Sequence, residues 1–138
     1  SLRFRGVSRL CGDKGTLTHY RQVRIERTRQ LLAGRVRTAR TLPERMVGLL
    51  GRRSLPSGEG LILPSCRSIH TWGMQFAIDA LFVNRHWEVV AIHPAIPPGR
   101  MTPIVWRAQS VLELAAGAAE QAQVRVGDRL LLEPSVVS

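Results

Sequence analysis

One carboxylate, Asp79, lies in the middle of an apolar run with the composition of a buried strand. The residues before it read FAI and those after it read ALFV. A charge in such a run is costly to bury unless hydrogen bonds or a cation satisfy it. The run therefore predicts a core strand, with Asp79 as either a structural anchor or part of a site.

Alternating apolar residues and closely spaced turn residues predict further strands along the chain. The expected strand segments are GRVRTAR, GLILP, FAIDALFV, WEVVAIHP, SVLELAA and a closing LLLEP. NRH, between the third and fourth of these, is typical of a hairpin turn. The VGD turn before the last segment leads directly into the closing strand.

One clear helix is predicted between residues 41 and 51. Thr41 followed by Glu44 forms a capping box, and Pro43 suits an early helical position. An apolar stripe formed by Leu42, Met46, Leu49 and Leu50 would pack on the sheet, and Gly51 would end the helix. The segment AAEQAQ would add one helical turn. Together these patterns predict an α+β fold, mostly antiparallel, as a compact sheet or a partly closed small barrel with one main helix.

A length of 138 residues suits one domain with a tail. We expect residues 1–32 to be a basic N-terminal extension, either disordered or forming a short helix in HYRQVRIERTRQLL. The domain would then cover residues 33–134, and residues 135–138 would be a tail. No apolar run approaches the roughly 18 residues of a membrane span, and no secretory signal core is visible at the N-terminus. The compartment stays open between cytoplasm and envelope.

The net charge of +10 is concentrated in the N-terminal part of the chain. Residues 1–53 carry 14 Lys or Arg against 3 acids, and residues 54–138 carry 6 against 7. Such a patch can bind nucleic acid or an anionic membrane through residues 3–40. Lys14 is the only lysine, a bias that a GC-rich genome produces without selection for binding. Only Phe4 and Tyr20 could stack on bases in this segment, which disfavours nucleic acid.

Cys66 and His70 are candidates for a nucleophile and its base, with Asp79 or Glu113 as the orienting third group. In the structural alternative, Cys66 is a small buried hydrophobe and His70 bonds a loop carbonyl. A metal site is a further option, with His70 and Asp79 as the first candidates and Glu113 and His93 as remoter ones. Their spacing is not diagnostic, and no cofactor is predicted. Cys11 and Cys66 lie far apart in sequence and belong to no CxxC pattern, so a disulfide scaffold is not indicated, and a single bridge between them is the minority alternative for an exported protein.

A ligand pocket is the third option for this region. Trp72, Met74 and the proline-rich loop would form its apolar wall, with Trp106 adding to it and Asp79 or Arg100 supplying a polar contact. Core packing is the structural alternative for these side chains. Glu113 inside VLELAA has the same ambiguity as Asp79, and Arg100, Arg107 or backbone amides are the expected partners if both are structural.

Four sequence blocks carry a resemblance to a known family. They are GLLGRRSL, EGLILPSCRSIHTWGMQFAIDALFVN, VLELAAG and VRVGDRL. In order and spacing they resemble the domain of unknown function 192 (DUF 192) family, also called uncharacterised protein family 0127, over about residues 34–133. The central block is similar to a pattern CxxIHTxxMxFxID, carried here by Cys66, Ile69, His70, Thr71, Met74, Phe76, Ile78 and Asp79. Gly73 and Ala77 replace an aromatic and a proline that are usual there.

The resemblance implies a compact β-rich domain, often found in exported or membrane-associated prokaryotic proteins, with no agreed catalytic residues. We therefore expect a monomeric, non-enzymatic accessory module that binds a protein or small molecule, linked to an envelope or secretion system. The alternatives are a small enzyme or metal-binding protein using Cys66, His70 and Asp79, and a binder of nucleic acid or anionic membrane through the Arg-rich N-terminal part.

Overall fold

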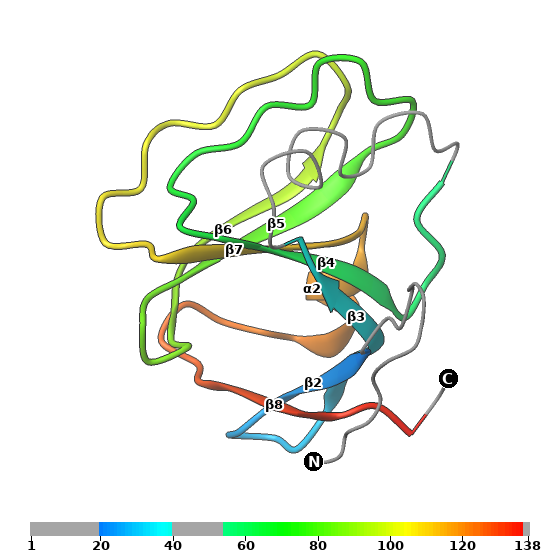
Figure 1. Ribbon diagram of the computed structural model, residues 1–138, viewed down its shortest axis with the longest axis vertical. Coiled ribbons are helices and arrows are strands. Elements are labelled where there is room, and N and C mark those ends of the chain that lie inside the picture. Colours follow the sequence, from blue (N-terminus) through cyan, green and yellow to red (C-terminus); the bar gives the residue numbers. More distant parts are fainter. Residues whose placement is uncertain (1–19, 40–53, 137–138) are drawn as a thin grey trace, which may run out of the picture.

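One curled sheet dominates the computed structural model, which describes residues 20–39 and 54–136. Within these residues the sheet has seven strands in the order β6-β5-β7-β4-β3-β2-β8 (Figure 1). In chain order the elements are β2 (Arg21–Ile25), β3 (Leu31–Thr38), β4 (Glu59–Pro64), β5 (Ile78–Val83), β6 (Val89–Ile96), β7 (Ser110–Ala115), α2 (Ala118–Ala122) and β8 (Leu130–Pro134).

The sheet is mixed but mostly antiparallel. Five of the six neighbouring strand pairs are antiparallel, and β3 and β4 run parallel. The edge strands approach each other at one end, where an isolated bridge joins Glu88 to Arg129 and the N–H of Leu130 donates to the Trp87 carbonyl at 2.8 Å. The result is a half-barrel, which agrees broadly with the expected mostly antiparallel α+β fold.

The helix in the described residues is α2, which lies where the segment AAEQAQ predicted a helical turn. Gly117 precedes it with φ of 92°, a left-handed conformation that glycine adopts without steric cost. Ala119 and Ala122 are the buried residues of α2, which packs against β3 and β7. The main helix expected between residues 41 and 51 lies outside the described residues.

The two faces of the sheet contact two different cores. The helix-side core contains Leu81, Val83 and the buried alanines of α2. The loop-side core contains Ile78, Ala80 and Phe82, together with residues of the two long loops 65–77 and 97–109. Successive residues of a strand point to opposite faces, so a strand with a core on each side is apolar throughout. This explains the unbroken apolar run of β5, in which every residue is buried.

Residues 21–32 do not form the short basic helix that was one expectation for this segment. Arg21–Ile25 is strand β2, paired with both β3 and β8, and a turn leads into β3 at Leu31. Val23 and Ile25 are fully buried in the helix-side core, whereas Arg24 between them is half-exposed. The inward side chains of Val23 and Ile25 alternate with Arg24 as in a strand, and pairing with the distant strand β8 stabilises this conformation.

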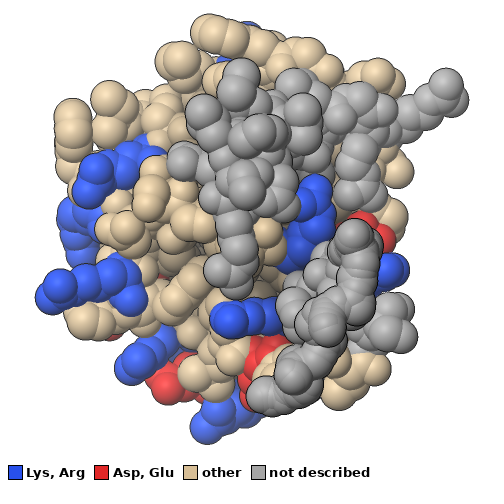
Figure 2. Space-filling view, viewed as in Figure 1, with Lys and Arg blue, Asp and Glu red and all other residues tan. Residues whose placement is uncertain are grey.

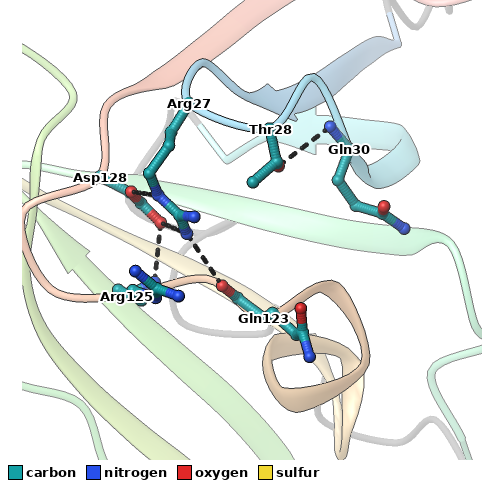
Figure 3. A network of polar contacts seen from close by, with 6 residues as sticks. All are labelled: Arg27, Thr28, Gln30, Gln123, Arg125 and Asp128. Carbon is teal, nitrogen blue, oxygen red and sulfur yellow. Dashed lines mark hydrogen bonds and ion pairs between the residues drawn. The ribbon is translucent and has the colours of Figure 1, made fainter.

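An ion pair ties the β2–β3 turn to the turn before β8. The Arg27 guanidinium donates Nε–H to Asp128 Oδ1 at 2.7 Å and Nη2–H to Oδ2 at 2.9 Å (Figure 3). Arg27 Nη2 also donates to the Gln123 carbonyl at 3.2 Å, and the backbone N–H of Arg125 donates to Asp128 Oδ2 at 2.8 Å. The Arg27 hydrogen bonds lower the pKa of Asp128, and Asp128 raises the pKa of Arg27 in return.

In the described part of the chain, no helix has the length and apolar character needed to cross a membrane.

Candidate functional site

Asp79 lies opposite a β-bulge in β6. Between the pairs Ile78↔Ile96 and Ala80↔His93 the register shifts, so that Pro94 and Ala95 oppose Asp79 alone. A bulge leaves an N–H without a ladder partner. The freed N–H of Ala95, whose φ is 49°, donates to Asp79 Oδ1 at 2.8 Å. The carboxylate therefore replaces a missing sheet hydrogen bond.

The second oxygen of Asp79 holds the start of α2. Asp79 Oδ2 accepts the backbone N–H groups of Gly117 at 3.1 Å and Ala119 at 2.9 Å. The side chain is fully buried, and the first N–H groups of a helix have no partner within the helix. Three backbone amides thus satisfy one buried carboxylate, which is the geometry of a structural anchor.

Glu113 of β7 is the other carboxylate of the sheet interior. It lies between Ala80 of β5 and Leu61 of β4, on the face of the loop-side core, and is 6% exposed. Among the described residues no hydrogen bond or ion pair to its carboxylate is found. Burial disfavours the charged form and raises its pKa to about 7. Glu113 is thus a buried acid that changes charge near neutral pH.

The structure does not bring Cys66, His70 and Asp79 together. Cys66 packs against the loop-side core and its thiol donates to the Ser68 carbonyl at 3.1 Å. His70 is exposed, with its ring stacked on Trp72 at 4.8 Å between centroids. Asp79 points to the helix-side face of β5, so the sheet separates its carboxylate from Cys66. The contacts found among the described residues do not join Cys66 to His70, as a nucleophile and its base require.

The metal candidates are dispersed in the same way. Asp79 lies on the helix-side face, whereas Glu113 and His93 lie on the loop-side face with Ala80 between their strands. His93 is half-buried with its ring edge-on to Phe82 at 5.4 Å. In the described ranges, no three His, Cys, Asp or Glu side chains gather closely enough to hold a metal ion.

The two long loops, residues 65–77 and 97–109, are held together by an irregular antiparallel ladder. They run beside each other in green and yellow at the top and left of Figure 1. The N–H of Thr71 donates to the Arg100 carbonyl at 2.8 Å, and the N–H of Val105 donates to the Arg67 carbonyl at 2.8 Å. Between these positions His70 forms a bridge with Met101. The two loops therefore form one layer over the loop-side core.

Two buried threonines fix the loops from within. Thr71 Oγ1 donates to the Pro97 carbonyl at 2.7 Å and accepts the N–H of Arg100 at 2.9 Å. Thr102 donates its N–H to the Ile69 carbonyl at 2.9 Å, and its Oγ1 accepts the Ile69 N–H at 3.1 Å. These bonds satisfy backbone groups that the sheet does not reach. They position the outward side chains of both loops.

Four large apolar side chains project from these two loops into solvent. Their exposed fractions are 54% for Trp72, 61% for Met101, 52% for Ile104 and 75% for Trp106. We call these four residues, together with Arg67, Arg100 and Arg107, the paired-loop surface. All three arginines are exposed. Large apolar side chains exposed together on two adjoining loops make this surface a candidate interaction site.

The charge of the paired-loop surface has one sign. The sequences of residues 65–77 and 97–109 contain three arginines and His70 but no Asp or Glu. Figure 2 shows no acidic side chain at the upper left of the molecule, where the two loops lie. Arg67 is partly fixed, since its Nε–H donates to the Ala108 carbonyl at 3.1 Å. The surface thus combines apolar and cationic groups.

The sequence candidates Trp72, Arg100 and Trp106 are all exposed here, whereas Met74 is half-buried against the loop-side core. Met101 and Ile104 were not among the sequence candidates. Their proline-rich segment gave no periodicity from which exposure could be predicted. The only indication in the sequence that this segment lies at an interaction surface was its composition, which is apolar and basic without acidic residues.

Two hollows lie beside α2, away from the paired loops. One of about 490 Å³ is lined by Ser57, Glu120, Gln121 and the small residues 115–118. The other, of about 170 Å³, is lined by residues 30–34, 57–58, 118 and 121–122. Most of these lining residues have small side chains, and neither hollow includes a sequence-predicted site residue.

The comparisons with known proteins identify a family and a fold. The model of the DUF192 family, described as an uncharacterized ACR, matches residues 23–132. The crystal structure of a candidate transcription regulator from Sinorhizobium meliloti 1021 is similar, with a TM-score of 0.73 and 22% identity, covering 86% of this chain and 98% of that one. A protein of unknown function from Novosphingobium aromaticivorans DSM 12444 has a TM-score of 0.72 and 22% identity, covering 92% and 94%. No curated protein matches the sequence.

At 22% identity the two structures establish a shared fold and nothing about activity. The family match covers most of the chain and begins in β2, at Val23. It confirms the resemblance that the four sequence blocks indicated. This chain belongs to the DUF192 family.

Proposed function

We propose that this chain is a non-enzymatic binding module and that a partner docks on the paired-loop surface. The observation that carries the proposal is the exposure of Trp72, Met101, Ile104 and Trp106 on loops that are themselves well fixed. Removing one such side chain from water on binding is favourable by roughly 1.5–3 kcal/mol. A rigid surface loses little conformational freedom when it binds.

The alternative of a small enzyme has weaker support. Cys66, His70 and Asp79 occupy different environments, and the Asp79 oxygens are already bonded to backbone amides. For a binding module, Cys66→Ser should leave partner affinity unchanged, because the Cys66 side chain lies against the loop-side core. An enzyme that used the thiol would lose its activity in the same variant.

The proposed setting, a prokaryotic envelope or secretion system, rests on the family resemblance. A binder of nucleic acid or membrane through residues 3–40 remains the second alternative, and residues 3–19 and 40 of that segment lie outside the described residues. The paired-loop surface does not include any of that segment. Substitutions in the paired loops and substitutions in residues 3–40 therefore distinguish docking on the paired-loop surface from binding through the N-terminal part.

Site-specific photocrosslinking in producing cells tests the proposal. A photoreactive phenylalanine analogue is placed at Trp106, and the matched control carries it at Val126, which is 61% exposed between Arg125 and Gly127. We expect adducts from Trp106 and none from Val126. Mass analysis then assigns the adduct to protein, lipid, nucleic acid or a second copy of the chain. Equal or absent adducts at both positions would refute a docking role for these loops.

A further inference from the structure

We propose that the partner of the paired-loop surface is an anionic lipid bilayer. The inference rests on the proposed function and names its partner. The side chains of Trp72, Met101, Ile104 and Trp106 would enter the boundary between headgroups and acyl chains. The arginines of the same loops would contact lipid phosphates.

The pairing of the two loops brings exposed apolar side chains of both loops to neighbouring positions. Met101 lies opposite His70, whose ring stacks on Trp72. Trp106 follows Met101 by five residues, which span at most about 18 Å. Tryptophan prefers the membrane interface because its ring is apolar and its N–H is polar, and aliphatic side chains such as Met101 and Ile104 prefer the acyl boundary.

Charge complementarity points to an anionic surface rather than a neutral one. The two loops carry Arg67, Arg100, Arg107 and His70 and no carboxylate that would repel phosphate. Each arginine near an anionic bilayer strengthens binding by electrostatic attraction. At physiological salt this attraction is screened over a distance of about 8–10 Å. The hydrophobic contribution to the binding free energy is not screened by salt. Binding should therefore weaken with salt but persist at a lower level.

Single-stranded nucleic acid is the competing anionic partner, and the side chains fit it less well. Base binding depends on open aromatic faces. One face of the Trp72 ring is stacked on His70. Met101 and Ile104 have no stacking role toward bases, whereas both add affinity for acyl chains. The composition of the surface thus favours lipid.

The test uses the full chain with vesicles of phosphatidylcholine, with and without phosphatidylglycerol, whose acyl chains carry bromine atoms. Two of the three tryptophans, Trp72 and Trp106, lie on the surface, and Trp87 packs against the helix-side core. We expect bromine to quench the fluorescence on anionic vesicles, and the quenching to disappear in W72F/W106F. This readout reports insertion of the loops and not merely sedimentation of a basic protein.

Affinity measurements on variants complete the design. Met101→Ser combined with Ile104→Ser keeps both tryptophans and should lower vesicle affinity by about tenfold or more for each side chain. Arg100→Gln combined with Arg107→Gln should lower it by about fivefold for each arginine. Val126→Ser and Arg85→Gln replace exposed residues of the same kinds elsewhere and should leave affinity unchanged.

Three results would overturn the lipid assignment. The first is vesicle binding without tryptophan quenching, which indicates adsorption through the Arg-rich N-terminal part. The second is equal vesicle affinity of M101S/I104S and the wild type. The third is displacement of the vesicles by a single-stranded oligonucleotide that binds through Trp106. Protein adducts from Trp106 in the crosslinking experiment, together with no vesicle binding, would retain the proposed function and reject the bilayer as partner.

Discussion

The Asp79 carboxylate accepts the backbone N–H of Ala119 at 2.9 Å, although the two residues are 40 positions apart in sequence. The same side chain accepts the N–H of Ala95 in the β6 bulge. One residue of β5 therefore joins the edge strand of the sheet to the start of α2. The hydrogen-bond network explains why a charged residue is tolerated in β5, a strand in which every residue is buried.

Asp79→Asn should destabilise the fold by about 2–4 kcal/mol. An asparagine keeps only one acceptor oxygen, so its NH₂ group would face at least one backbone N–H inside the core. Urea unfolding of the two proteins measures the difference. Glu120→Gln, which changes an exposed acid in the first turn of α2, is the control and should stay within about 0.5 kcal/mol of the wild type. Equal stability of D79N and the wild type would contradict the anchor role.

Glu113→Gln should make the protein more stable at neutral and higher pH. The native Glu113 keeps its proton up to a pKa of about 7, whereas the unfolded chain releases it near 4.5. Between these values the native state binds more protons, so wild-type stability falls as pH rises, by up to about 3 kcal/mol in all. The glutamine is neutral throughout and lacks this decline.

Unfolding curves of wild type and E113Q at pH 5, 6, 7 and 8 measure the effect. The difference between the two proteins should grow with pH and level off above the native pKa of Glu113. Glu120→Gln again serves as the matched control, because that carboxylate is exposed. Parallel stability profiles for E113Q and wild type would show that Glu113 is not a buried acid.

Asp128 should give the protein part of its sensitivity to acid. The Arg27 hydrogen bonds hold the native pKa of Asp128 below its unfolded value of about 3.9. The stabilisation is therefore complete above about pH 4 and is lost as the pH falls through the native pKa. Asp128→Asn should cost about 1 kcal/mol at pH 7, since the half-exposed Arg27 is screened by water.

The same variant should show a weaker loss of stability below pH 4 than the wild type. Thermal unfolding between pH 2 and 7 makes the comparison, and Glu133→Gln, at a more exposed ion pair with Arg24, is the control. If D128N and wild type lost stability in parallel over this range, the Arg27–Asp128 pair would have no part in acid sensitivity.

The sequence predicted best those strands whose pattern is visible in neighbouring residues, such as an apolar run followed by a turn. Asn84 and Trp87 close the β5–β6 turn with a backbone hydrogen bond of 3.0 Å, where NRH indicated a hairpin. The buried state of Asp79 was also predictable, because seven apolar neighbours surround it in sequence. Which amides satisfy it was not, since Ala119 reaches it only through the pairing of β5 with β7 and the turn at Gly117.

Long-range contacts account for the expectations that differed from the structure. Strand β2 pairs with β8, more than 100 residues away, and that pairing overrides the helical tendency of a segment rich in Arg and Gln. The exposure of Met101 and Ile104 depends on hydrogen bonds of Thr71 and Thr102 across two loops. No periodic pattern encodes such contacts.

Gly60→Ala should destabilise the protein because β4 has no room for a side chain at this buried position. A Cβ atom there would lie 3.0 Å from the backbone carbonyl oxygen of Glu113 and 3.0 Å from Leu114 Cδ2. The strand would have to move away from β7, at a cost of about 1–3 kcal/mol. Gly34→Ala is a matched control in the neighbouring strand, since its Cβ would meet only Leu31 Cδ2 at 3.7 Å. Urea unfolding should therefore rank G60A well below G34A, and equal stability of the two would mean that β4 and β7 are less closely packed than the distances indicate.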